Sequence, residues 1–266
     1  MSNLALYRKY RSADFDEVVG QGHVVQALQN AIENGKHSHA YLLTGPRGVG
    51  KTSIARIIAK RLNRIPKNDD LSQHLDIIEI DGASNRGIDE IRNLKEKIQV
   101  APASLSYKVY IIDEVHMLTK DAFNALLKTL EEPPSHVVFI FATTEIQKVP
   151  ATILSRTQRF DFKPITATDI TKHLRFIADK EKIQIDDEAL GLIARLSHGG
   201  FRDAISLLDQ VSSFGDKITA QTVAELTGLQ DEVAIISIID LIKNHEPDKV
   251  IQSLQGLYEK GADSAL

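Results

Sequence analysis

Cysteine is absent from this sequence of 266 residues. The chain can therefore form no disulfide and no cysteine-ligated zinc site, although this absence leaves the redox compartment open. No apolar run approaches the ~18 residues that a membrane-spanning helix needs. The opening residues, MSNLALYRKYR, contain no apolar core followed by a small-residue cleavage site, so they do not predict a secretion signal. These absences favour the cytoplasm as the location and argue against a membrane partner.

An excess of basic residues is also missing. The chain has 32 Lys and Arg against 36 Asp and Glu, which gives a net charge of -4. A molecule with this balance is no polycation, so any contact with nucleic acid requires a local basic face. The length and the 42% share of hydrophobic residues predict a globular protein of two or three domains, each with its own core.

Short apolar runs alternate with helical patterns over the first part of the chain, which is typical of an α/β domain with a central parallel sheet. Two of these runs are nearly continuous, as expected for central strands that are covered on both faces. We expect strands at 40–44, 75–80, 108–112 and 137–141, and helices at 24–32, 51–62, 88–98 and 122–130.

The pattern changes near Lys163 and Pro164, beyond which only helices are predicted. They are expected at 167–180, 187–196, 202–214 and 219–226, several with Thr or Asp just ahead of them as N-caps. A third helical pattern starts near Gln230, and too few residues follow it to build a domain. We therefore predict an α/β nucleotide-binding domain over 1–163, a small all-helical domain over 164–229, and the truncated start of a third unit over 230–266.

The strongest motif is a complete phosphate-binding loop, or P-loop. It matches G-x-x-x-x-G-K-[ST], follows the predicted strand 40–44 and opens the predicted helix 51–62, which is the context that the motif requires. Its backbone N–H groups and the helix N-terminus favour phosphate. Lys51 would reach the β- and γ-phosphates of ATP, and the Thr52 hydroxyl would bind magnesium. A glycine-rich turn with a chance lysine is the weaker alternative. The motif consists of Gly45, Pro46, Arg47, Gly48, Val49, Gly50, Lys51 and Thr52.

Two adjacent acids, Asp113 and Glu114, follow the predicted strand 108–112 in the Walker B arrangement. Asp113 would hold the magnesium shell, and Glu114 would polarise the water that attacks ATP. Such a pair could also be a solvated turn or a helix cap, but a P-loop in the same chain favours the catalytic interpretation. The second acid predicts hydrolysis in addition to binding. His116 is expected to support or pack against this site and not to be a ligand.

Three further polar residues have two possible roles each. Thr144, just beyond the strand 137–141, could contact the γ-phosphate or position water, or its hydroxyl could cap the turn. Arg156 and Arg202 have the planar donor fork that suits phosphate oxygens, but each could also be a plain surface arginine. Arg86, Arg92 and Lys95, just before and within the predicted helix 88–98, could present donors to a nucleic-acid backbone or simply belong to a solvated amphipathic helix.

Together these motifs resemble the tau/gamma subunits of the bacterial DNA polymerase III clamp loader, which are AAA+ ATPases. The resemblance covers essentially the whole chain and keeps the family order and spacing. Besides the P-loop and the acidic pair, it rests on YRKYR at 7–11, FDEVVGQ at 15–21, FNALLKTLEEPP at 123–134, ATTE at 142–145, TILSR at 152–156 and the segment 200–208.

The resemblance implies roles for the residues that the sequence alone leaves ambiguous. Thr144, and not the adjacent Thr143, matches the sensor 1 position. Arg156 matches the arginine finger that reaches the ATP of a neighbouring subunit, and Arg202 matches sensor 2, which reads the γ-phosphate in its own subunit. The helix after Asn85 corresponds to one that lines the DNA channel.

Further assignments follow from the same resemblance. The DNA-contact candidates are Asn85, Arg86 and Arg92, and the adenine-side residues are Tyr7, Arg11, Val18 and Val19. The unit from about Gln230 corresponds to the start of the collar that holds the subunit ring together.

The chain departs from the family at two places. The family usually carries a four-cysteine zinc module between the P-loop helix and the second strand, whereas here the segment 64–74 is short and has no cysteine. We therefore expect no zinc. Thr157 stands where the family has cysteine after the finger, and we expect little consequence because the arginine carries the chemistry.

The resemblance implies an AAA+ motor subunit that binds ATP with Mg²⁺ and hydrolyses it. Its partners would be the other clamp-loader subunits in a ring, the sliding clamp and primer–template DNA. It would be a component of a DNA-directed DNA polymerase holoenzyme without polymerase chemistry of its own. Two alternatives stay open: a loader subunit that only binds partners, which the intact P-loop and acidic pair disfavour, and a hexameric branch-migration helicase, which the segments 7–21 and 152–156 disfavour.

Overall fold

A five-stranded parallel sheet forms the centre of the first domain, with the strand order β2-β3-β4-β1-β5. The computed structural model describes residues 4–85, 87, 97–215, 217–228, 243 and 249–251. Parallel strands end at a common edge, and ligands of open α/β sheets bind beyond that edge. The strands are β1 (Ala40–Thr44), β2 (Ile77–Asp81), β3 (Lys108–Asp113), β4 (Val137–Thr143) and β5 (Gln158–Asp161).

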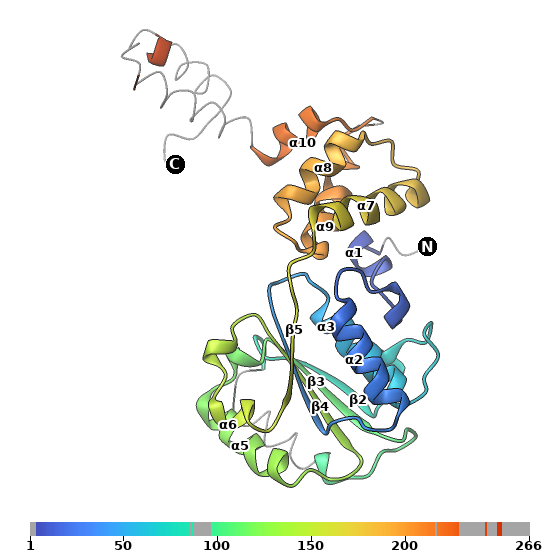
Figure 1. Ribbon diagram of the computed structural model, residues 1–266, viewed down its shortest axis with the longest axis vertical. Coiled ribbons are helices and arrows are strands. Elements are labelled where there is room, and N and C mark those ends of the chain that lie inside the picture. Colours follow the sequence, from blue (N-terminus) through green and yellow to red (C-terminus); the bar gives the residue numbers. More distant parts are fainter. Residues whose placement is uncertain are drawn as a thin grey trace.

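Helices cover both faces of the sheet (Figure 1). Successive side chains of a strand point to opposite faces, so the apolar runs of the central strands supply two cores at once. Within β1, Tyr41 and Leu43 belong to one core, whereas Leu42 belongs to the other. The first core lies under α2 (Gly22–Glu33) and α3 (Lys51–Leu62); the second lies under α5 (Lys120–Glu131) and α6 (Ala151–Leu154).

The second domain consists of helices around a separate apolar core. The short helix α1 (Leu6–Lys9) packs onto this core although it begins the chain, and the backbone N–H of Leu6 donates to Asp209 Oδ2 at 3.2 Å. Figure 1 shows α1 beside α7 and α9. The four helices are α7 (Ala167–Glu181), α8 (Asp187–Leu196), α9 (Phe201–Val211) and α10 (Ala220–Thr227).

Threonine side chains begin several of these helices, as the sequence predicts. Thr119 accepts a hydrogen bond from the N–H of Ala122 at the start of α5, and Thr166 accepts one at the start of α7. Thr219 forms a capping box with Thr222 at the start of α10. Each cap satisfies backbone donors that have no partner inside the helix.

Some element limits differ from the prediction. The second strand begins at Ile77 and not at 75, because Leu75 is 82% exposed and Asp76 points its carboxylate at a neighbouring loop. Helix α9 ends at Val211, before the exposed Phe214. Neither the short helix α1 nor the short strand β5 was predicted.

Two predictions fall on residues that the structure does not describe. Of the expected helix 88–98 only residues 97 and 98 are described, and of the expected third unit over 230–266 only residues 243 and 249–251. The connection between the domains is described fully: β5 ends at Asp161, residues 162–166 form no helix or strand, and α7 begins at Ala167.

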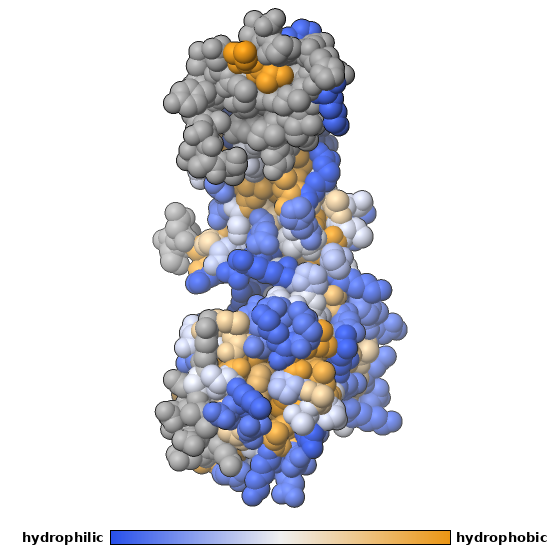
Figure 2. Space-filling view, turned by 90° about the vertical axis from the view of Figure 1, so that its left-hand side faces the viewer, coloured by the Kyte–Doolittle hydropathy of each residue, from blue (hydrophilic) through white to orange (hydrophobic). Residues whose placement is uncertain are grey.

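On the face that Figure 2 shows, hydrophilic residues gather at the narrow waist between the two domains. Within the described residues, no helix is both long and apolar enough to cross a membrane.

Candidate nucleotide-binding site

A cleft with a cavity volume of about 150 Å³ lies between the carboxyl edge of the sheet and the helical domain. The residues predicted to bind ATP meet here although they come from distant parts of the chain. Those that line the cleft are Tyr7, Arg11, Val18, Val19, Arg47, Gly48, Val49, Gly50, Lys51, Thr52, Asp113, Glu114 and Arg202.

The P-loop connects β1 to α3, with Gly50 as the N-cap residue of α3 at φ 101°. Lys51 is 6% exposed, and its ammonium group donates to the carbonyl oxygens of Gly45 at 2.8 Å and Pro46 at 2.6 Å. Burial lowers the pKa of Lys51, and the smaller opposing effects come from Glu114 and Asp113. The two P-loop residues that do not line the cleft, Gly45 and Pro46, thus take part by holding the lysine.

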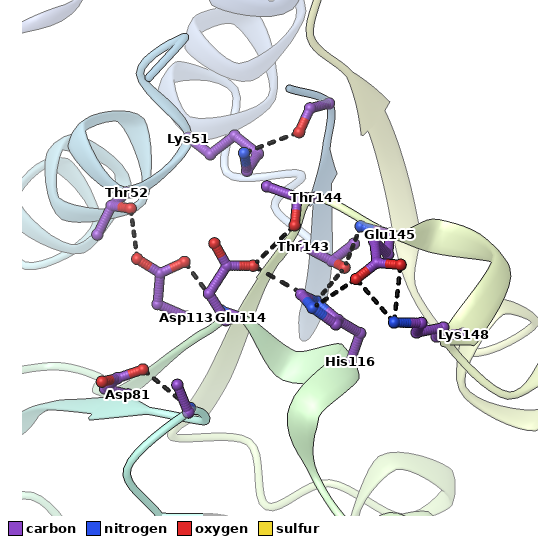
Figure 3. A network of polar contacts seen from close by, with 12 residues as sticks. Lys51, Thr52, Asp81, Asp113, Glu114, His116, Thr143, Thr144, Glu145 and Lys148 are labelled. Carbon is purple, nitrogen blue, oxygen red and sulfur yellow. Dashed lines mark hydrogen bonds and ion pairs between the residues drawn. The ribbon is translucent and has the colours of Figure 1, made fainter. Parts of the chain in front are cut away.

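The two candidate magnesium ligands face each other across the site. Thr52 Oγ1, at the start of α3, donates to Asp113 Oδ2 at the end of β3 over 2.6 Å (Figure 3). Hydroxyl and carboxylate oxygens suit Mg²⁺, which often binds through one or two protein ligands together with substrate phosphates. Among the described residues, no group of three or more His, Cys, Asp and Glu is placed to hold a metal alone. The donor set therefore fits magnesium that arrives with a nucleotide.

Glu114 is held in a backbone conformation that few residues with a side chain adopt. Its φ of 46° and ψ of 46° lie in the left-handed region, where strain is often found at functional sites. Its carboxylate accepts a hydrogen bond from Thr144 Oγ1, with 3.1 Å between Glu114 Oε2 and the hydroxyl oxygen. Because β4 is the neighbour of β3, the residue after β4 can reach the residue after β3. Thr144 therefore lies beside Glu114 at the carboxyl edge of the sheet.

The helical domain touches the P-loop directly. The backbone N–H of Phe201 donates to the carbonyl oxygen of Gly48 at 2.9 Å. The next residue, Arg202, has its guanidinium carbon 5.1 Å from the centre of the Tyr7 ring. Arg202 thus borders the same cleft as the phosphate loop, although its domain folds around a different core.

Several cleft residues were missed by the sequence analysis. Tyr10, His173 and Phe201 line the side formed by the helical domain. The rings of His173 and Phe201 lie 4.9 Å apart and are tilted by 61°, and burial lowers the pKa of His173, which favours a neutral ring. Tyr10 lies within the segment 7–11 and Phe201 lies next to Arg202, so both had a signal in the sequence. His173 had none, and it reaches the cleft through the packing of α7.

Arg156 lies away from this cleft, after α6 on the opposite face of the sheet from α2 and α3 (Figure 1). Its guanidinium group forms an ion pair of 2.6 Å with Glu131 at the end of α5 and donates to the carbonyl oxygen of Thr152 at 2.7 Å. It therefore does not serve the cleft of its own chain in this structure.

Of the DNA-contact candidates, the structure describes only Asn85, while Arg86 and Arg92 lie outside the described residues. The side-chain amide of Asn85 donates to the carbonyl oxygen of Asp81 at 3.0 Å. Asn85 thus closes the turn that follows β2 and does not enter the nucleotide cleft.

Two family models match this chain. The model described as "DNA polymerase III, delta subunit" covers residues 20–166, more than half of the chain. The model described as "DNA polymerase III clamp loader subunit, ATPase lid domain" covers residues 169–217.

Curated relatives match along nearly the full chain. "DNA polymerase III subunit tau" of Bacillus subtilis is 46% identical over 279 residues, which span 100% of this chain and 50% of the relative. "DNA polymerase III subunit gamma" of Buchnera aphidicola is 39% identical over 277 residues, which span 99% of this chain and 77% of the relative. The chain belongs to the tau/gamma family of DNA polymerase III subunits. It spans about half the length of the Bacillus subtilis member of that family.

Solved structures confirm the predicted AAA+ fold of this tau/gamma chain. Thermotoga maritima RuvB, described as a Holliday junction branch migration motor, superposes with a TM-score of 0.65 over 88% of this chain and 80% of its own. The identity is 23%, so the likeness concerns the fold alone.

Proposed function

We propose that this chain is the ATP-hydrolysing motor part of a replicative clamp loader and works within a DNA polymerase III holoenzyme. The observation that carries the proposal is the contact of 2.6 Å between Thr52 and Asp113, with Glu114 next to it on the same cleft. A subunit that only binds partners has no need for this complete set of phosphate, magnesium and water-activating groups.

The chemistry would be the transfer of a phosphoryl group to water, which depends mainly on positioning and on the stabilisation of charge. Lys51 and the P-loop amides would bind the phosphates, and Thr52 and Asp113 would hold magnesium, which neutralises developing charge when bound. Glu114 would take the proton of the attacking water. Thr144, which donates to Glu114, would keep that carboxylate and the water in register.

The helical domain would serve as a lid that responds to the nucleotide. The hydrogen bond from Phe201 to Gly48 and the position of Arg202 on the cleft support this role, because both connect the lid to the part of the cleft that the P-loop forms. Tyr7, Arg11, Val18 and Val19 would face the adenine. We divide the chain accordingly at 163 and 229, with the collar beginning at 230.

The assembly would be built from this chain and other loader subunits in a ring, in the cytoplasm. ATP binding would order the ring, open the sliding clamp and grip primer–template DNA, and hydrolysis would release the clamp onto DNA. Family membership supports these partners. Arg156 would be the finger that each subunit offers to the ATP of its neighbour, and Asn85, Arg86 and Arg92 would face DNA.

Two variants of the natural full-length subunit, assembled with its partners, test the proposal. Lys51→Ala should lower ATP affinity, because it removes a charge that contacts phosphate before the reaction. Glu114→Gln keeps the shape and removes the base, so ATP should bind and persist. Equilibrium binding and steady-state turnover separate these effects, and capture of the sliding clamp in the presence of ATP tests the partner. Normal turnover by Glu114→Gln would refute the assigned base.

A further inference from the structure

His116 lies behind the acidic pair, in the short helical turn η3 (Val115–Met117) that follows Glu114. Its side chain is only 5% exposed. The turn places the imidazole between the carboxyl ends of β3 and β4, so that it faces residues from both strands (Figure 3). A buried imidazole needs partners for its ring nitrogens, since an unpaired polar atom is costly to bury.

The two ring nitrogens face different groups. Nδ1 lies 3.0 Å from Thr143 Oγ1 and 3.4 Å from Glu114 Oε2. Nε2 lies 3.3 Å from Glu145 Oε1 on the other side of the ring. Glu145 is itself fixed, because its carboxylate pairs with Lys148 at 2.8 Å and its backbone N–H donates to Thr143 Oγ1 at 3.0 Å. Glu145 thus holds the ring at Nε2, while Nδ1 faces Thr143 and the carboxylate of Glu114.

Glu114 gains a second neighbour from this arrangement. Thr144, just after β4, contacts Glu114 Oε2, and His116 contacts the same oxygen from behind. The other carboxylate oxygen has no dashed contact in Figure 3, and Glu114 lines the cleft. A general base must be held within hydrogen-bond reach of its water, and a displacement of about 1 Å can cost ~10²-fold in rate.

We propose that His116 is a positioning residue for ATP hydrolysis, which orients the carboxylate of Glu114 through Nδ1 while Glu145 anchors the ring through Nε2. This inference rests on the proposed function. His116 itself touches neither nucleotide nor water in this role and acts through Glu114.

Isosteric substitutions in the full-length assembled protein separate the two ring nitrogens. The amide of asparagine can replace Nδ1, and that of glutamine can replace Nε2. We expect His116→Ala to lower kcat about 10- to 100-fold with the affinity for ATP changed less than about twofold. His116→Asn should recover most of the lost turnover, because it keeps a donor next to Glu114. His116→Gln should recover little, because it keeps only the contact with Glu145.

A double-variant cycle provides a readout that a purely structural role would not give. When Glu114 is replaced by glutamine, the base that His116 orients is gone, so adding His116→Ala should reduce the residual turnover no further. His136→Ala is the matched control, because the His136 ring also makes a hydrogen-bond contact within the same domain, 3.2 Å from the carbonyl oxygen of Ile98, but lies at the opposite end of β4. It should keep parental turnover.

The outcomes distinguish this inference from the proposed function. Parental kcat in His116→Ala, or equal losses in the alanine, asparagine and glutamine variants together with a lower melting temperature, would overturn the positioning role. In both cases Glu114→Gln would still abolish hydrolysis, and the proposed function would stand. If the parent protein does not hydrolyse ATP, or if Glu114→Gln hydrolyses it normally, the proposed function and this inference fail together.

Discussion

A Cβ atom on Gly82 would lie 2.7 Å from the carbonyl oxygen of Glu114 and 2.9 Å from that of Asp113. The backbone N–H of Gly82 also donates to the carbonyl oxygen of Asp113 at 2.8 Å. The backbone of the turn that leads from β2 to Asn85 therefore packs directly against the backbone of Asp113 and Glu114. Any movement of this turn has to be shared by the residues that are proposed to hold magnesium and activate water.

Gly82→Ala should disturb catalysis more than nucleotide binding. A methyl group at 2.7 Å from a backbone oxygen forces a shift, and overpacking of this kind costs about 1–3 kcal/mol of stability. We expect turnover of the assembled protein to fall about tenfold while ATP affinity changes little. Gly22→Ala is the control, since nothing lies within 4 Å of its Cβ position. Equal turnover in the two variants would contradict the argument.

The magnesium requirement should depend on the Thr52 hydroxyl. Thr52→Ser keeps the oxygen that contacts Asp113, and Thr52→Val keeps the shape without it. We expect the serine variant to need nearly the parental Mg²⁺ concentration and the valine variant about tenfold more or greater, since a lost ligand weakens a site that has few protein ligands. Titration of turnover with Mg²⁺ after removal of metal by a chelator measures this. Identical titration curves for the two variants would rule out Thr52 as a ligand.

Asp76 is a buried carboxylate with a structural role. It is 1% exposed, and its oxygens accept hydrogen bonds from the backbone N–H groups of Ala103, Ser104 and Leu105 at 2.8, 2.8 and 3.0 Å. Burial acts to raise its pKa, but the hydrogen bonds to the ionised form outweigh it and hold the pKa of Asp76 below its usual value. The carboxylate thus fixes the loop that precedes β3.

Asp76→Asn should destabilise the protein near neutral pH by about 1.5–3 kcal/mol, the usual loss for hydrogen bonds to a charged group. Because the folded pKa is depressed, the contribution is present above the unfolded pKa of about 3.9 and is lost as the pH falls through the folded pKa. Urea unfolding at pH 7 and at acidic pH should therefore show a difference between variant and parent that shrinks on acidification. A difference that is independent of pH would contradict this.

Tyr110 is also buried, but removing its polar group should not destabilise the protein as removing that of Asp76 should. It is fully buried in β3, its ring stacks on Phe139 at 5.6 Å, and its hydroxyl has no hydrogen-bond partner among the described residues. Burial raises the pKa of this hydroxyl to about 12. Tyr110→Phe removes an unsatisfied polar atom and keeps the ring, so the free energy of unfolding should stay the same or rise by about 1 kcal/mol. A loss of more than 1 kcal/mol would show that the hydroxyl is bonded in solution.

The sequence predicted best those elements that carry a regular apolar pattern beside a recognisable motif. The limits of β1 and α3 were predicted to the residue, because an apolar run and a helical pattern flank a motif of fixed length. The edge strand β5 was missed because Gln158 and its neighbours are mostly exposed and show no apolar alternation. The short helix α1 was missed because it takes its stability from packing on the other domain.

The residues of the candidate site were also predicted only in part. The P-loop and the acidic pair lie in continuous motifs, so their residues could be assigned before the fold was known. Two adjacent threonines could not be distinguished by the residues alone, and the family resemblance favoured Thr144. The structure gives them different partners, since Thr144 donates to Glu114 whereas Thr143 is fully buried beside His116. This difference depends on how the neighbouring strands β3 and β4 end in the folded protein, and a local sequence pattern does not contain that information.

The last prediction concerns the proposed finger, Arg156, and the residue that holds it in the isolated chain. Arg156 pairs with Glu131 over 2.6 Å, with side chains that are 31% and 50% exposed. An exposed pair of this kind contributes about 0.2–1 kcal/mol, so it orients the arginine without preventing its release. In a ring, the phosphates of a neighbouring ATP would compete with Glu131 for the guanidinium group, and Glu131→Gln should leave turnover at the parental value or slightly above it.

Arg156→Ala should behave differently from every change within the cleft. In the full-length assembly, ATP affinity should stay nearly the same and turnover should fall by ~10³-fold or more, the scale of arginine fingers that act between subunits.

Mixed rings give the control. Lys51→Ala subunits retain a good finger and Arg156→Ala subunits retain a good P-loop, so neither should hydrolyse ATP efficiently alone. Mixing them should restore part of the activity where the two intact halves meet. Co-assembly without recovery, or full activity of a dilute monomeric chain, would show that Arg156 does not act on a neighbouring site.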